Sequence, residues 1–469
     1  MTRISSLLRG ILILLGGALS FNMAARDAES YLSAKLPAKW GADTVSAYSG
    51  LVPGEFPIED PLLDTLIAIG RANNFDIAAA ARRIEIARAG VASARSAYYP
   101  QLGISAGWSR DRLSGRVDSR TGSASVSSAF AANATVSWEI DVFGKIRRQV
   151  KEAKASVNVS AAEYEATLVS LDAEIATTYI GLLVDKAQLD VANRHAIEQK
   201  HIVDITETRY RTGLVSKLDV AQARTLYYST VAQVPLLEAS IEAAYNGIAV
   251  LLGMERSELP PALFSGRSVP SVFSLPPLGT PLDLLRRRPD IVEAERNIDV
   301  AAAALGIARS QYLPSLTLQA SAGTQAHNFG DLFSGPSFTY TVAPALSWAV
   351  FDGFARRAAG ISARQSLQIA VDNYNLVVLT AVEEVRNAMV SYTAALKYIE
   401  RLEKVLENSS ETVSLSLDQY KQGLGDFYNV VEAELGYLNY QSSFEEARGR
   451  ALDAIVTLYK SLGGAYAAR

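Results

Sequence analysis

The feature that most constrains this chain is an internal duplication. Short motifs recur in the same order in the two halves, displaced by 214 positions near the start of each half and by 210 positions further on. The matching pairs are Tyr98-x-Pro100-x-Leu102 with Tyr312-x-Pro314-x-Leu316, Ser137-Trp138 with Ser347-Trp348, Gly213-Leu214 with Gly423-Leu424, and Leu252-Gly253 with Leu462-Gly463. A register held over so many positions predicts two copies of one structural unit.

The duplication divides the chain into segments. We predict repeat 1 over residues 61–253 and repeat 2 over residues 281–463, joined by a proline-rich linker at 254–280 and followed by a short tail at 464–469. Residues 21–60 contain several prolines, which favour an extended N-terminal arm, with plain disorder as the alternative.

The first twenty residues have the order of a secretory signal. Arg3 and Arg9 precede the apolar run Ile11–Leu15, and Ala18-x-Ser20 offers small residues for cleavage, so we expect residues 1–20 to be a signal peptide. A membrane anchor is the alternative, but the run is short for a span of about 20 residues.

Each repeat contains two stretches in which apolar and small polar residues alternate, as in β-strands. These stretches predict β-hairpins at 100–143 and 314–352, the first with a long polar loop from Arg110 to Ser128. A soluble sheet packed on a core would also alternate. Long strands, an apolar face ending in Trp138 or Trp348, and a polar loop at one end favour a transmembrane β-barrel.

Four strands cannot close a barrel. The smallest membrane barrels have about eight strands, and an open edge in lipid would leave backbone groups without hydrogen bonds. The chain is therefore expected to oligomerise, and a trimer would supply twelve strands.

The remainder of each repeat is predicted to be helical. A first helix, at Leu62–Ala97 in repeat 1, precedes the hairpin, and proline-free helices follow at 145–211 and 356–422. About 65 residues make a rod of roughly 100 Å. Gly213 and Gly423 suit helix C-caps, after which return helices are expected at 218–252 and 428–462.

Several classes of function find no support in the sequence. The net charge is −4 with acidic and basic residues interspersed, which predicts no nucleic-acid partner. No catalytic or nucleotide-binding motif occurs, so we expect neither an enzyme nor a cofactor. His195, His201 and His327 suggest no metal triad, and Arg286–Arg288 before Pro289 are expected to be structural, at a helix boundary.

Taken together, the motifs resemble the outer membrane factor family, the TolC-like exit ducts, and most closely its NodT or OprM-like branch. The resemblance extends over about residues 60–463 and is carried by Leu285-Arg-Arg-Arg-Pro-Asp-Ile291, Tyr312-Leu-Pro-Ser-Leu316, Trp138-Glu-Ile-Asp-Val-Phe-Gly-Lys145 and Trp348-Ala-Val-Phe-Asp-Gly353.

The resemblance implies an α+β membrane protein in the outer membrane of a Gram-negative bacterium. It implies a homotrimer, with a twelve-stranded β-barrel in outer membrane lipid continued by a twelve-helix tunnel through the periplasm. Partners would be a periplasmic adaptor protein and an inner membrane pump of the RND, ABC or MFS type. Many relatives in this branch carry a lipidated cysteine after the signal, whereas this chain has Ser20 there and no cysteine anywhere, so no acyl anchor is expected.

In this family the tunnel is gated at its periplasmic tip, just after the hairpin glycines. Matched by position, Asp219 and Glu432 fall on acidic gate positions and Tyr428 on a bulky plug position. Asn429 takes a place that is an aspartate in some members. The alternative for Asp219 and Glu432 is that both carboxylates merely suit the first turns of helices, where negative charge favours the macrodipole.

The predicted function is a passive exit duct of a tripartite efflux system. A type I protein secretion duct, an autonomous outer membrane pore and a non-transporting coiled-coil scaffold are the alternatives. Helices of roughly 100 Å argue against a simple pore, and alternation in all four strands argues against a scaffold.

Overall fold

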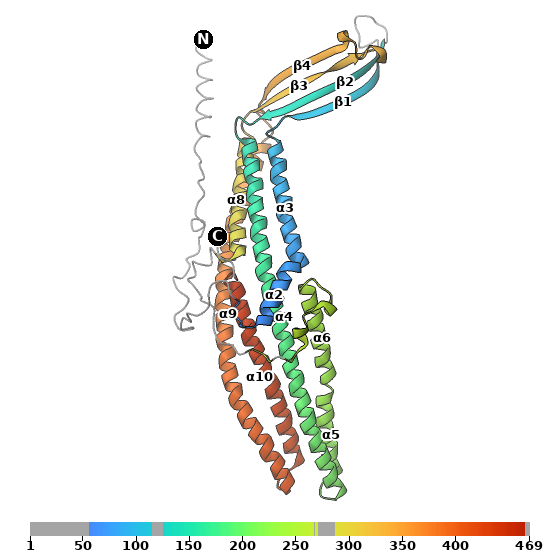
Figure 1. Cartoon of the computed structure of the whole chain (residues 1–469). Helices are drawn as coiled ribbons and strands as arrows, with labels where there is room; N and C mark the ends of the chain where they lie inside the picture. The colour runs from blue at the N-terminus through green and yellow to red at the C-terminus, as the bar shows by residue number, and fades with distance from the viewer. Residues whose placement is uncertain (1–55, 115–124, 267, 271–286, 465–469) are drawn as a thin grey trace.

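The computed structural model describes residues 56–114, 125–266, 268–270 and 287–464. It is a long bundle of helices with one β-sheet at its end (Figure 1). The expected signal peptide, most of the N-terminal arm, the last part of the linker and nearly all of the tail lie outside the described residues.

The sheet contains all four expected strands in the antiparallel order β1-β2-β3-β4. Their bounds are β1 Gln101–Leu113, β2 Ser125–Ile140, β3 Ser315–Ala326 and β4 Phe338–Ser347. The two hairpins therefore lie side by side through β2 and β3, which pair although they come from different repeats. Strands β1 and β4 form the two edges, and neither has a second neighbour in the described chain.

The strand register places one apolar row on one face of the sheet. Leu102 pairs with Val136, Val136 with Ala320, and Ala320 with Val342, so alternate apolar residues of all four strands align. Polar and small residues align in the same way on the other face, as in the row Gly103, Thr135, Ser321 and Thr341. Many apolar side chains are exposed in the single subunit, including Ile104 at 91% and Tyr340 at 73%.

Two details of the hairpins differ from the sequence prediction. Strands β1 and β2 extend through Leu113 and from Ser125, well into the stretch predicted as a loop from Arg110 to Ser128. The strand pairing continues because the polar residues there pair across the hairpin as regularly as the apolar ones. In repeat 2 the last strand ends earlier than predicted, at Ser347, so Trp348 lies just outside β4.

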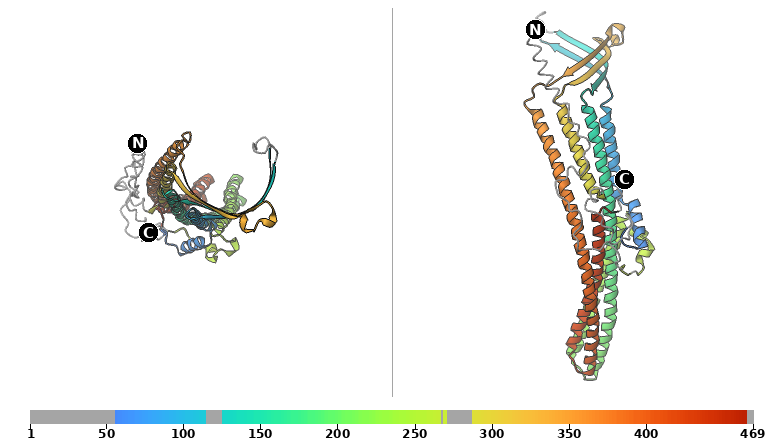
Figure 2. Two further views of the ribbon diagram at one scale, coloured as in Figure 1. Left: turned by 90° about the horizontal axis from the view of Figure 1, so that it is seen from above. Right: turned by 90° about the vertical axis from the view of Figure 1, so that its left-hand side faces the viewer.

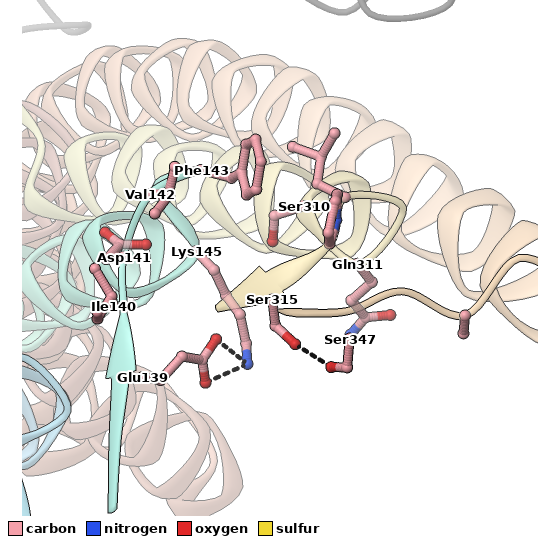
Figure 3. A pocket seen from close by; sticks show the side chains of 13 residues that line it. Glu139, Ile140, Asp141, Val142, Phe143, Lys145, Ser310, Gln311, Ser315 and Ser347 are labelled. Atoms are coloured by element: carbon pink, nitrogen blue, oxygen red, sulfur yellow. Dashed lines mark hydrogen bonds and ion pairs between the residues drawn. The ribbon is translucent and has the colours of Figure 1, made fainter. Parts of the chain in front are cut away.

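Both long helices begin at a similar junction below the sheet. Asp141 accepts hydrogen bonds from the backbone N–H groups of Ile146 and Arg147 at the start of α4 (Lys145–Arg211), and Asp352 accepts one from Arg356 at the start of α9 (Ala355–Gln422). A cavity of about 250 Å³ lies at this junction between the two repeats (Figure 3). Beside it, the Nζ of Lys145 donates to both carboxylate oxygens of Glu139.

The long helices begin and end within one residue of their predicted ranges. Helix α4 contains a window apolar enough to cross a membrane by composition, but 56% of that window is buried inside the protein. It packs against α3, α5, α6, α8 and α10, which explains its apolar character as core packing.

Two other helices predicted as continuous are each broken. The first helix divides into α2 (Pro61–Asn73) and α3 (Phe75–Ser96), because the side chain of Asn74 accepts from the N–H groups of Asp76 and Ile77 and starts a new helix. The first return helix divides into α5 (Lys217–Val231) and α6 (Val234–Leu251), with Pro235 in the first turn of α6. In repeat 2 the return helix α10 is continuous over Phe427–Ser461.

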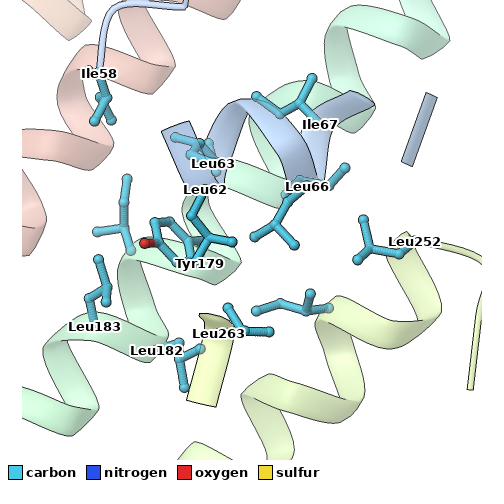
Figure 4. Close-up of a cluster of buried hydrophobic side chains, with 14 of the residues drawn as sticks. Ile58, Leu62, Leu63, Leu66, Ile67, Tyr179, Leu182, Leu183, Leu252 and Leu263 are labelled. Atoms are coloured by element: carbon cyan, nitrogen blue, oxygen red, sulfur yellow. The ribbon is translucent and has the colours of Figure 1, made fainter. Parts of the chain in front are cut away.

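One apolar core joins α2, the middle of α4 and α6 (Figure 4). Tyr179 is buried there, and its hydroxyl lies 2.7 Å from Oδ2 of Asp60, the N-cap of α2. The proline-rich linker contributes to the same core. Its described part forms short 3-10 turns at Arg256–Glu258 and Pro261–Phe264, and buries Leu259 and Leu263 in this core.

A second core lies between α8 (Pro289–Ser310), α9 and α10. At the start of α8 the buried guanidinium of Arg288 donates to Asp290, to Glu384 and to the backbone carbonyl of Ser461. Arg288 therefore has the structural role predicted for the arginine run. Viewed along the long axis, the sheet and helices follow an arc rather than a closed ring (Figure 2).

Candidate channel gate at the helical tips

The end of the bundle farthest from the sheet consists of two helical hairpins (Figure 1). In both turns the glycine is left-handed, with φ of +74° at Gly213 and +76° at Gly423. The residue after each glycine donates its N–H five positions back, from Leu214 to Arg209 and from Leu424 to Gln419, each at 2.9 Å. This is the Schellman geometry expected of glycine C-caps.

The two hairpins are bonded to each other at this end. The hydroxyl of Tyr420 on α9 donates to Oδ2 of Asp219 on α5 at 3.3 Å, and Arg209 on α4 donates to the backbone carbonyl of Lys421 at 2.7 Å. The guanidinium of Arg209 also lies 5.1 Å from the centre of the Tyr420 ring. The three interactions join repeat 1 to repeat 2 within one chain.

A small apolar cluster supports these polar contacts. It consists of Ile202, Val203, Ala223, Tyr420, Phe427 and Val430. The rings of Tyr420 and Phe427 meet edge to face at 4.9 Å. Burial and the neighbouring Asp219 carboxylate raise the pKa of Tyr420, so its hydroxyl remains a donor at neutral pH.

Asp219 has two structural roles in its own helix. Its N–H donates to Oγ of Ser216, the N-cap of α5, and the Ser216 hydroxyl lies 2.5 Å from Oδ1 of Asp219. Asp219 therefore does lie in the first turn of a helix, as the alternative interpretation expects. Its bond to Tyr420 is an additional contact between the two hairpins, which a position at a helix start does not require.

The remaining predicted gate residues lie on α10. Tyr428, Asn429 and Glu432 are all exposed, with Tyr428 at 60%. Tyr428 and Glu432 are four residues apart and so share one face of the helix. Within the described part of the chain, Glu432 forms no hydrogen bond or ion pair with Asp219, so the structure does not bring the two predicted acidic positions together in one subunit.

Sequence reasoning missed Tyr420 and Arg209 as tip residues. Tyr420 lies three residues before Gly423, and its equivalent in repeat 1, Tyr210, lies three residues before Gly213 and is 44% exposed. Because the repeat gives both tyrosines the same sequence context, only the packing of α9 against α5 and α10 could single out Tyr420.

The interpretation of the histidines also changes. The three histidines do not meet, but His195 on α4 lies buried beside Glu198 of the same helix and Glu434 of α10. This cluster depends on the packing of α10 against α4, which the spacing of residues along one helix does not reveal.

The chain has an amphipathic sheet with two open edges, and its helical hairpins reverse at a tip far from that sheet. Together these two features define the class of duct-forming outer membrane subunits. Comparison with known families gives the particular family. The model of the outer membrane efflux protein family matches residues 66–254 and 281–464, which correspond closely to the two repeats, and the chain belongs to this family.

Curated relatives agree with this assignment. The chain is 30% identical over 443 residues to the pyoverdine export outer membrane protein OpmQ of Pseudomonas putida, with 92% of each protein covered. It is 26% identical over 433 residues to nodulation protein T of Rhizobium leguminosarum, again with 92% of each covered. The solved outer-membrane channel OprN superposes with a TM-score of 0.79 at 29% identity, over 92% of this chain and 99% of that one.

The protein is therefore an outer membrane efflux protein, an exit duct located in the outer membrane and reaching into the periplasm. Its family and relatives are transport proteins rather than enzymes.

Proposed function

We propose that three copies of this chain close one continuous tube, with twelve strands in the outer membrane and twelve helices at the tip. The observation that carries the proposal is the sheet, which has one apolar face and two unpaired edges, β1 and β4. Lipid offers no partner for edge N–H and C=O groups, so β4 of one subunit must pair with β1 of the next. Three arcs of four strands give a barrel of ordinary size.

An uncovered stripe on α9 supports the same assembly. Ile361, Ile369, Leu376, Leu379 and Val390 are all at least 50% exposed. At about 100° per residue they lie within about 80° of one another around the helix. A long apolar stripe of this kind marks a contact surface, and a neighbouring subunit would cover it.

The proposed gate is a constriction where the hairpin tips of the three subunits converge. Tyr428, Asn429 and Glu432 would face one another across the threefold axis, with Asp219 behind them. Three Glu432 carboxylates around one axis would repel each other and attract cations. The phenol of Tyr428 would narrow the opening.

The contacts between hairpins supply a closed-state latch. Tyr420 and Arg209 hold α9 against α5 and α4, so widening the tip by moving one hairpin away from the other must break both bonds. The energy for opening and transport would come from partners, a periplasmic adaptor docked at the tips and an inner membrane pump behind it.

Cross-linking tests the assembly, because the chain has no cysteine of its own. Thr341→Cys on the polar face of β4 is combined in turn with Gly103→Cys, Ser105→Cys or Gly107→Cys on the polar face of β1. In outer membranes, at least one pair should form disulfide-linked dimers and trimers and nothing larger, whereas Thr341→Cys alone should form none. A ladder longer than three, or no cross-link from any pair, would contradict the proposal.

A further inference from the structure

A cluster of buried polar side chains lies inside the contact between α4 and α10. His195, Gln199 and Glu434 are at most 2% exposed, and Glu198 lies beside them at the surface. Several of their polar atoms are buried without a hydrogen-bond partner in the described structure, namely Nδ1 of His195, both amide atoms of Gln199 and Oε2 of Glu434. Buried polar atoms are normally satisfied, so the cluster requires an explanation.

The hydrogen bond between His195 and Gln441 bears on whether Nδ1, on the other side of the imidazole, faces the Glu434 carboxylate as a donor or as an acceptor. Nε2 of His195 lies 3.0 Å from Oε1 of Gln441, and with the Gln441 amide in this orientation Nε2 is the nitrogen that carries the proton. In neutral histidine Nδ1 is then a lone pair, and it points at Oε2 of Glu434. Two acceptors facing each other in a buried site need a positive charge between them.

The distance between the His195 nitrogen and the Glu434 oxygen indicates whether a proton or a metal ion fits between them. Nδ1 of His195 and Oε2 of Glu434 are 3.5 Å apart, longer than a charge-assisted hydrogen bond of about 2.8 Å. Two ligands at about 2.1 Å from a tetrahedral metal ion are about 3.4 Å apart. The spacing therefore suits a shared metal ion better than a shared proton.

Helix geometry places a third candidate ligand beside these two atoms. Glu198 is three residues after His195 on α4 and lies on the same face. One ligand atom each from His195, Glu198 and Glu434 lie within 4.8 Å of one another. Gln199, one residue further on, places an unbonded amide oxygen in the same contact. Because Glu198 is exposed, an ion can enter from the surface.

We propose that His195, Glu198 and Glu434 bind one divalent transition-metal ion per subunit, of the Zn²⁺ class. An imidazole nitrogen with carboxylate oxygens suits Zn²⁺ and its neighbours Co²⁺ and Ni²⁺, whereas Ca²⁺ and Mg²⁺ take oxygen ligands alone. Gln441 is a positioning residue, which fixes the tautomer and orientation of the imidazole from behind, as second-shell partners of metal-bound histidines do.

Comparison of the two repeats shows that packing alone does not require this cluster. Displaced by 210 positions, His195 corresponds to Val405, Glu198 to Asn408 and Glu434 to Arg224. Arg224 instead forms an ion pair with Glu207 at 2.8 Å. The site is thus particular to the contact of α4 with α10, and a bound ion would clamp these two helices together.

The test uses the full-length protein, purified without a histidine tag, stripped with chelator and titrated with Co²⁺ and Zn²⁺. We expect one ion per subunit, visible absorption bands typical of tetrahedral Co²⁺, and a higher melting temperature with Zn²⁺. His195→Gln and Glu434→Gln should each abolish the Co²⁺ bands and the shift in melting temperature. Gln441→Ala should weaken Zn²⁺ binding about 10- to 100-fold. His201→Gln, an exposed histidine of the same helix, is the matched control and should change nothing.

A second measurement covers the case in which the variants do not fold. X-ray absorption at the zinc edge of the wild-type protein should show one histidine nitrogen at about 2.0–2.1 Å. Absence of tight binding by the wild-type protein, or binding that His195→Gln and Glu434→Gln leave intact, would overturn the proposal. The cluster would then be a buried ion pair or a water-filled contact.

Discussion

The hydroxyl of Tyr420 donates to the carboxylate of Asp219, 201 residues earlier in the chain, across the junction of the two hairpin tips. The bond joins α9 of repeat 2 to α5 of repeat 1, beside an apolar cluster and the hydrogen bond from Arg209 to the carbonyl of Lys421. It is the most direct connection between the predicted gate residue Asp219 and the packing of the tip.

Removing this bond should favour the open tip. Tyr420→Phe retains the ring that packs on Phe427 but loses the donor, and a hydrogen bond to a charged group contributes about 1.5 kcal/mol. We expect roughly a tenfold larger open population per subunit, measured as higher conductance in planar bilayers. Tyr210→Phe, the equivalent position in repeat 1, is the control and should leave conductance unchanged. Equal conductance of Tyr420→Phe and wild type would show that this hydrogen bond does not hold the tip closed.

The exposed residues of α10 should limit the closed opening. Glu432→Ala and Tyr428→Ala each shorten a side chain proposed to face the axis, so single-channel conductance should rise in both. Glu432→Ala should also reduce the preference for cations, because it removes the carboxylate ring. Glu85→Ala on α3, far from the tip, should do neither. If conductance and selectivity stay at wild-type values, Glu432 and Tyr428 do not form the constriction.

The hairpin glycines should matter through backbone conformation alone. A Cβ added at Gly213 or Gly423 meets no atom within 4 Å, yet both residues have positive φ. Alanine there should cost roughly 1–2 kcal/mol of stability, measured as a lower melting temperature. Gly90→Ala is the matched control, since it also meets no atom within 4 Å and lies inside α3. It should instead stabilise the protein by about 0.5–1 kcal/mol. A neutral Gly213→Ala would contradict the assigned turn geometry.

Asp453 should make stability depend on pH. It lines a groove of about 650 Å³ between α9 and α10, and burial raises its pKa to about 6. Because the folded protein then binds this proton more tightly than the unfolded chain, the contribution of Asp453 favours folding at low pH and is lost as pH rises from about 4 to about 6.

The sign of that effect can be measured. Asp453→Asn imitates the protonated side chain, so it should raise the melting temperature at pH 7 and flatten its dependence on pH between about 4 and 6. Glu403→Gln, an exposed carboxylate of α9, should have no such effect. A lower melting temperature for Asp453→Asn at pH 7 would show that the carboxylate has a partner in the assembled protein.

Much of the fold could be predicted because the duplication and the periodicity act over long stretches. The long helices were placed within a residue, since no proline interrupts them and a glycine ends each one. The breaks at Asn74 and before Val234 do not follow from apolar periodicity, although Pro235 marks the second one in the sequence. The side chain of Asn74 creates the first break by capping the new helix, and this local hydrogen bond does not alter the apolar periodicity.

The tip and the buried polar cluster were less accessible from sequence. Asp219 was selected by its distance from Gly213, whereas Tyr420 and Arg209 act through contacts between repeats. His195 and Glu434 meet only because α10 packs on α4, and periodicity along one helix carries no information about which other helix covers it.

The central claim is that one chain supplies only part of a closed wall. The most direct test is the mass of the assembly that the protein forms in detergent. Native mass spectrometry of the protein extracted from outer membranes should give three chains and, on stepwise activation, loss of one chain at a time. A species of one chain, stable and dispersed without detergent, would contradict the account.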